Sequence, residues 1–92
     1  MIGSFRHKGL RDLYEAGRAK GVRQDQIKRI RAILARLDAA KGPKDMDMPG
    51  LRLHPMRGDL RGFWAVDASG NWRIIFRFDD ETPCDVDLVD YH

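Results

Sequence analysis

The sequence predicts an α+β fold in which two N-terminal helices pack on a small antiparallel β-sheet. Apolar residues recur at helical spacing in the first half of the chain and at every second position in the second half. The dipeptide Gly42-Pro43 separates these two regions. Helices followed by strands are typical of α+β proteins, and 92 residues suffice for one modest core. We therefore expect a single domain spanning residues 1–92.

Two helices are expected before the Gly-Pro pair. The first covers residues 7–16, and residues 2–6 before it are compatible with a short strand. Its apolar stripe consists of Leu10, Leu13 and Tyr14. The second helix has a longer stripe, formed by Ile27, Ile30, Ile33, Leu34 and Leu37. Asp25 lies near its start, where an acidic side chain interacts favourably with the helix dipole.

Strands separated by turn residues are expected after a loop at residues 44–50. They cover residues 51–54, 62–67, 72–78 and 84–88. Pro55 ends the first of them, and Gly70-Asn71 lies in the turn between the second and third. On the third strand, alternation directs the aromatic side chains towards the core. Arg73 and Arg77 then project from the opposite face.

The net charge of +3 conceals a strong asymmetry along the chain. Residues 1–41 contain eleven Lys and Arg against four Asp and Glu, a net charge of +7. Residues 42–92 contain six against ten, a net charge of −4. A basic half of this size favours a polyanionic partner such as a nucleic acid, although a solvated helix face is the simpler alternative. Off the apolar stripe of the second helix lie Lys28, Arg29, Arg31 and Arg36.

Several classes of protein are excluded by what the sequence lacks. It has neither a signal-peptide pattern nor an apolar run of the roughly 20 residues that span a membrane, so a soluble cytoplasmic protein is expected. The single Cys84 suits a reducing compartment. Its three histidines have no paired zinc spacing, and no glycine-rich phosphate loop is present. We expect no metal, no cofactor and no nucleotide-binding site.

Acid–base chemistry on RNA is the activity that the remaining polar residues favour. The ribose 2′-OH attacks the adjacent phosphorus once a base removes its proton, while an acid protonates the leaving oxygen and a cation stabilises the transition state. Histidine suits both proton transfers, and the planar fork of arginine matches phosphate oxygens. The candidates are His54, Arg73, Arg77, Asp90, Tyr91 and His92. Each has a structural alternative as a surface, capping or core residue, so an RNA-binding domain without catalysis stays open.

Four motifs, in this order along the chain, carry a resemblance to a known family. They are Gly3-Ser4-Phe5-Arg6-His7-Lys8-Gly9-Leu10, Leu51-Arg52-Leu53-His54-Pro55, Gly70-Asn71-Trp72-Arg73-Ile74, and Asp85-Val86-Asp87 through Asp90-Tyr91-His92. Together they resemble HigB-type toxins of the RelE superfamily over essentially the whole chain. That resemblance implies a microbial-ribonuclease-like sheet with two helices and metal-independent cleavage of messenger RNA in the ribosomal A site.

The resemblance also implies roles for individual residues and for partners. The catalytic positions fall on His54, Asp90, Tyr91 and His92, and the phosphate-binding basic positions on Arg57 and Arg73. Position 57 is often Lys in such toxins, so Arg57 keeps the charge with a different geometry. Apart from the resemblance, we expect Arg73 to stabilise charge, and Arg77 and Asn71 to contact RNA or phosphate. The expected ribosome-binding basic face consists of Lys8, Arg11, Lys28, Arg29, Arg31 and Arg36. The implied partner is a HigA-like helix-turn-helix antitoxin, through which alone the toxin reaches operator DNA.

Two other functions compete with this hypothesis. A ParE-like toxin has the same fold and inhibits DNA gyrase without cutting RNA, but His54 and the Asp-Tyr-His ending argue against it. An RNA-binding module without catalysis would be favoured if the histidines and Tyr91 proved dispensable.

Overall fold

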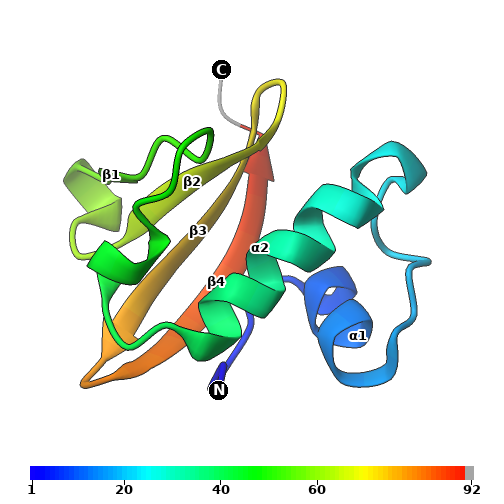
Figure 1. Cartoon of the computed structure of the whole chain (residues 1–92), viewed down its shortest axis with the longest axis horizontal. Coiled ribbons are helices and arrows are strands. Elements are labelled where there is room, and N and C mark those ends of the chain that lie inside the picture. The colour runs from blue at the N-terminus through cyan, green and yellow to red at the C-terminus, as the bar shows by residue number, and fades with distance from the viewer. Residues whose placement is uncertain (91–92) are drawn as a thin grey trace.

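Four antiparallel strands and two helices make up the fold in the computed structural model, which describes residues 1–90. The strands follow one another across the sheet in the order β1-β2-β3-β4, and both helices pack against one face (Figure 1). The strands are β1 (His54–Pro55), β2 (Trp64–Ser69), β3 (Trp72–Asp79) and β4 (Thr82–Asp90). The helices are α1 (Lys8–Ala16) and α2 (Ile27–Ala39). The predicted α+β class is confirmed.

Local capping explains where α1 begins and ends. The His7 Nδ1 atom accepts a hydrogen bond from the backbone N–H of Leu10 at 3.1 Å, which satisfies one free donor of the first turn. Gly17 ends the helix in the left-handed conformation at φ 68°. The chain then folds back so tightly that a Cβ on Gly9 would lie 2.5 Å from the carbonyl oxygen of Gly21. Only glycine allows this approach of two backbones.

The helix α2 supplies the central part of the core. Four residues of its predicted stripe are buried, with Ile30 and Leu37 fully covered, and Ile27 at the start of the helix is partly buried. A short 3-10 turn at Gln24–Gln26 precedes the helix, and another at Pro43–Met46 lies within the expected loop region. The sheet residues that face the helices pack against this stripe. They include Val66, Ile74, Phe76, Val86 and Leu88.

The opposite face of the sheet carries a second, smaller apolar cluster. Phe63, Ala65 and Ile75 are buried there, and Met56, Leu60 and Val89 pack around them. Because cross-strand partners share a face, one row across the sheet reads His54, Ala65, Ile75 and Asp87. The sheet face from which Arg73 and Arg77 were expected to project is therefore partly apolar. We call it the outer face.

Two predicted strands are much shorter than the alternation suggested. Residues 2–6 contribute one isolated bridge, between Phe5 and Val86. The strand expected over residues 51–54 is reduced to His54–Pro55, because Arg52 adopts a left-handed conformation at φ 54° and turns the chain. The strand ends at Pro55, as expected, and this proline lies at the sheet edge, where a missing N–H is tolerated.

Candidate active site

His54 lies on the edge strand β1 with its imidazole held from one side. Its Nδ1 atom is 2.8 Å from the carbonyl oxygen of Arg52. Because a carbonyl only accepts, Nδ1 carries the hydrogen of this bond, and the lone pair of a neutral ring is then on Nε2. This tautomer leaves Nε2 able to take up a proton from a substrate.

The local fold that orients His54 depends on the unusual backbone of Arg52. A non-glycine residue at φ 54° costs free energy and persists only where the surroundings fix it. Here the neighbouring Leu51 accepts a hydrogen bond of 2.7 Å from the backbone N–H of Asp67 on β2. The turn before His54 is thus anchored to the sheet.

His54 borders two hollows on the surface. One, of about 450 Å³, is lined by Arg52, Leu53, His54 and Arg73. The other, of about 500 Å³, is lined by His54, Pro55, Met56, Arg57 and Leu60. Arginine side chains thus border both hollows. Because guanidinium groups bind phosphate oxygens well, the two hollows together suit an extended anion such as a nucleic-acid backbone.

Arg73 is held by neighbouring groups and is only 16% exposed. Its cross-strand partner is Asp67, 18% exposed, whose Oδ1 lies 2.8 Å from Arg73 Nε. The N–H does not point at that oxygen, so the contact is an ion pair and not a linear hydrogen bond. Arg73 Nη1 donates to the carbonyl oxygens of Gly70, at 3.1 Å, and Trp72, at 3.2 Å. Asn71 is exposed in the same turn.

Of the other predicted site residues, Asp90 and Arg77 lie towards opposite ends of the sheet. Asp90 is exposed at the end of β4 and pairs with Trp72, so strand alternation places it with Leu88 on the helix side, whereas Arg73 pairs with Val89. Tyr91 and His92 lie outside the described residues. The end of β4 and the β2–β3 turn lie together at one end of the sheet (Figure 1).

Arg77 lies away from these hollows, towards the β3–β4 turn. It shares the outer face with Arg73, but buried Ile75 separates them along β3. Arg77 Nε donates to Asp85 Oδ2 at 2.6 Å, and this bond lowers the pKa of the Asp85 carboxyl. Structurally, Arg77 is the partner of Asp85 and not a neighbour of His54.

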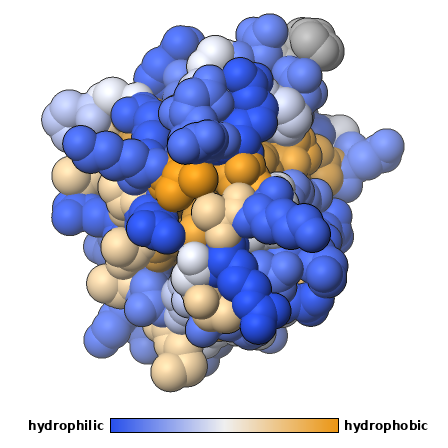
Figure 2. Space-filling model, turned by 90° about the vertical axis from the view of Figure 1, so that its right-hand side faces the viewer, coloured by the Kyte–Doolittle hydropathy of each residue, from blue (hydrophilic) through white to orange (hydrophobic). Residues whose placement is uncertain are grey.

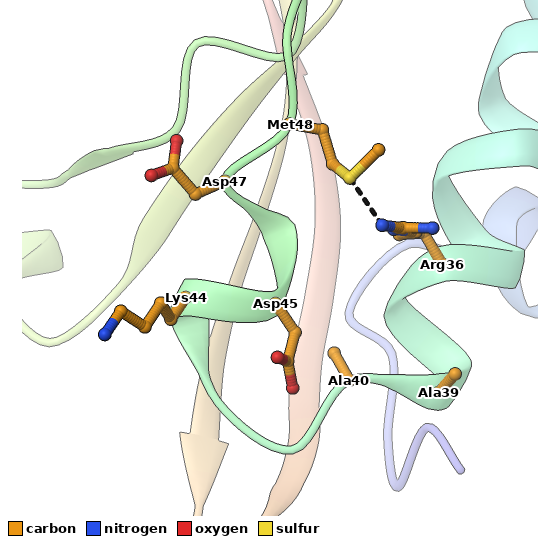
Figure 3. Close-up of a pocket in the computed structure, with 7 residues that line it drawn as sticks. All are labelled: Arg36, Ala39, Ala40, Lys44, Asp45, Asp47 and Met48. Atoms are coloured by element: carbon orange, nitrogen blue, oxygen red, sulfur yellow. Dashed lines mark hydrogen bonds between the residues drawn. The ribbon is translucent and has the colours of Figure 1, made fainter.

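The predicted basic face of the helices is exposed, but not all of its side chains are free of internal contacts. The exposed residues are Lys8, Arg11, Lys28, Arg29, Arg31 and Arg36. Arg29 Nη2 donates to the carbonyl oxygens of Gly50, at 3.0 Å, and Asp67, at 3.4 Å. Arg36 donates to the sulfur of Met48 across a hollow of about 430 Å³ (Figure 3). Seen from the side of α1, the surface is largely hydrophilic around a central apolar strip (Figure 2).

Two residues at the site, Arg52 and Asp67, were not singled out by sequence reasoning. Arg52 was named only within the motif Leu51-Arg52-Leu53-His54-Pro55, with no role of its own. Counting back from the Gly70-Asn71 turn would pair Asp67 with Ile74, on the core side. A register shift between Asp67 and Ser69 pairs it with Arg73 instead. A bulge of this kind has no clear signal in the sequence.

Within residues 1–90, no three His, Cys, Asp or Glu side chains are grouped so that they could hold a metal ion. No helix among the described residues has the length and apolar character needed to cross a membrane.

Comparison with known proteins gives one family and one curated relative. Residues 3–92 match the family of RelE-like toxins described as the toxin of type II toxin-antitoxin system HigB. The chain is 37% identical to the endoribonuclease HigB of Proteus vulgaris over 92 residues, which is the full length of both proteins.

Proposed function

The chain belongs to the HigB-like family of RelE-like toxins of type II toxin-antitoxin systems, and from this premise we propose that it is an endoribonuclease that cuts messenger RNA on the ribosome. The name of the full-length relative supports the endoribonuclease activity. The observation in the chain itself that supports it most is His54, whose Nδ1 bond to Arg52 leaves Nε2 for proton transfer between two arginine-lined hollows.

The proposed reaction is attack of the ribose 2′-OH on the adjacent phosphorus. The O–P bond to the 5′-oxygen of the next nucleotide breaks, which leaves a 2′,3′-cyclic phosphate and a 5′-OH. His54 transfers one of the two protons at Nε2, and Arg73 stabilises the charge of the phosphorane. The resemblance assigns the remaining catalytic positions to Asp90, Tyr91 and His92, and a phosphate contact to Arg57. We propose RNA contacts for Asn71 and Arg77 as well. None of these steps draws on a metal ion.

Partners follow from the same premise. Membership in a type II system implies an antitoxin. We propose that this antitoxin is a HigA-like helix-turn-helix protein that represses the operon encoding both proteins. The toxin would then reach operator DNA only in complex with the antitoxin. Cleavage would take place in the A site of cytoplasmic ribosomes. The exposed basic residues of α1 and α2 supply a surface suited to ribosomal RNA.

RNA cleavage assays, together with an assay of DNA gyrase activity, test the proposal. Purified protein is mixed with ribosomes carrying an mRNA, with the same mRNA alone, and with DNA gyrase. We expect cleavage only with ribosomes, products with a cyclic or 3′-phosphate and a 5′-OH, and no effect of EDTA at a concentration that leaves ribosomes intact. His54→Ala and His92→Ala should each abolish cleavage. Equal cleavage of naked mRNA would refute ribosome dependence, and loss of gyrase activity without RNA cleavage would support the ParE-like alternative.

A further inference from the structure

Three charged side chains form one cluster beside His54. Asp67 contacts Arg73 at 2.8 Å and Arg52 at 3.6 Å, so one carboxylate lies between two guanidinium groups. Both arginines line the same hollow as His54. The cluster has a net charge of +1, which attracts an anion while the carboxylate offsets repulsion between the arginines.

The three side chains differ sharply in their exposure. Asp67 and Arg73 are mostly covered, whereas the side chain of Arg52 is 77% exposed. Within residues 1–90, Arg73 Nη2 donates to no protein atom, while Nε and Nη1 contact neighbouring groups. Arg73 therefore offers a fixed donor at the base of the hollow, and Arg52 offers an exposed fork at its rim.

The backbone of Asp67 connects the cluster to its surroundings. Its N–H donates to the carbonyl of Leu51, and its carbonyl accepts from Arg29. The backbone of Asp67 thus ties the segment that carries Arg52 to β2, and β2 pairs with the strand that carries Arg73. A carboxylate in this position fixes the separation of the two arginines before any ligand arrives, which lowers the entropy cost of binding.

We propose that Arg52 and Arg73 bind a phosphate of the RNA chain next to His54, and that Asp67 is a positioning residue that holds both guanidinium groups for it. Arg52 is then a phosphate-binding residue of this toxin. The inference rests on the proposed function, because it takes RNA to be the substrate of the hollow.

The direction in which Asp67→Asn changes kcat shows whether Asp67 positions the arginines or acts only through its negative charge. Asp67→Asn removes a negative charge beside the phosphate, and electrostatics alone would then tighten RNA binding and raise kcat/KM. Positioning predicts a different pattern: kcat falls about tenfold because the guanidiniums lose their fixed geometry, while the affinity for RNA stays equal or rises.

The test compares Asp67→Asn and Arg52→Gln with the control Asp87→Asn. Asp87 is also on the outer face, but it accepts a hydrogen bond from the backbone of Leu88, and among the described residues the ion pairs of Arg52 and Arg73 are with Asp67. We would measure kcat and KM on ribosomes carrying mRNA, and the Kd for an uncleavable 2′-deoxy oligonucleotide over a range of salt concentrations. Arg52→Gln should weaken oligonucleotide binding and reduce the slope of log K against log salt by about 1. Asp87→Asn should match the wild type.

Each outcome decides the proposal. If Asp67→Asn keeps the kcat of Asp87→Asn, Asp67 does not position the arginines. If Asp67→Asn fails to fold, the Arg52→Gln variant still tests the phosphate site, because Arg52 is exposed. An unchanged Kd for the oligonucleotide and an unchanged salt slope in Arg52→Gln would overturn that site. A wild-type protein that binds the oligonucleotide through Arg52 but cuts no RNA would refute the endoribonuclease proposal alone.

Discussion

At the scale of single residues, Tyr14 and Asp38 form a contact outside the site that makes stability depend on pH. The Tyr14 hydroxyl donates to the Asp38 carboxylate, which also accepts from the backbone N–H of Ile2 at 3.2 Å. The shared hydrogen bond is the main cause of the raised pKa of Tyr14 and of the lowered pKa of Asp38. The folded state therefore favours a neutral tyrosine beside an ionised aspartate.

Replacing Tyr14 by Phe should therefore destabilise the protein only within a pH window. The lowered pKa of Asp38 gives stability that is present above its unfolded value, near pH 4, and lost as pH falls through the folded value. The raised pKa of Tyr14 gives stability that is present below pH 10 and lost above it. At pH 7 the loss should be at most about 1 kcal/mol, because solvent screens a half-exposed pair. Melting temperatures of both proteins at pH 3 and pH 7 test this. A gap at pH 3 as large as that at pH 7 would contradict it.

At the scale of secondary-structure elements, periodicity predicted what long, regular segments do. Both helices and the strands β3 and β4 formed where spacing indicated, because each buries a continuous apolar stripe. The short elements depended on single backbone conformations instead. The left-handed Arg52 shortened β1, and the irregularity after Asp67 moved that residue to the face of Arg73. Residue type was enough to select His54 and Arg73 as candidates, but not the Arg52 and Asp67 that hold them.

The contact between α2 and the sheet gives a prediction about Arg29. Because Arg29 bonds two backbone carbonyls, Arg29→Ala should lower the free energy of unfolding by about 0.5–1.5 kcal/mol. The neighbouring exposed Lys28 provides the matched control, and Lys28→Ala should change stability by less than about 0.5 kcal/mol. Urea denaturation of the three proteins measures the difference. Equal stability of the two variants would mean that the Arg29 contacts contribute nothing to the folded state in solution.

At the scale of the whole molecule, the charge asymmetry separates two surfaces. The half with a net charge of +7 forms both helices, and the half with −4 forms the sheet. A basic face of this kind binds a polyanion mainly by release of counterions, so its affinity falls steeply with salt. In the proposed function, arginines on and beside the sheet bind phosphate near His54.

Charge reversal on α2 tests this division. Lys28→Glu with Arg31→Glu should weaken ribosome binding at all salt concentrations and flatten its salt dependence, because two phosphate contacts are lost. Arg18→Glu with Lys20→Glu makes the same change of net charge on the segment after α1 and should have a smaller effect. Sedimentation of ribosomes with each protein at several salt concentrations measures this. Equal effects of the two pairs would show that net charge, and not the α2 face, determines binding.

The close approach of Gly9 and Gly21 has a genetic consequence for a toxin. A methyl group on Gly9 would collide with a backbone carbonyl, and one on Gly21 would lie 2.7 Å from the Gly9 Cα. We expect either substitution to push α1 away from the core and to expose Leu10 and Leu13, which are buried in the wild type. When cells that express the toxin are selected for survival after random mutagenesis, Gly9→Ala and Gly21→Ala should be recovered among the survivors. Gly42→Ala, where a Cβ meets no atom within 4 Å, should stay lethal. Survivor frequencies would then identify a requirement of the fold itself, at residues that take no part in the proposed cleavage chemistry.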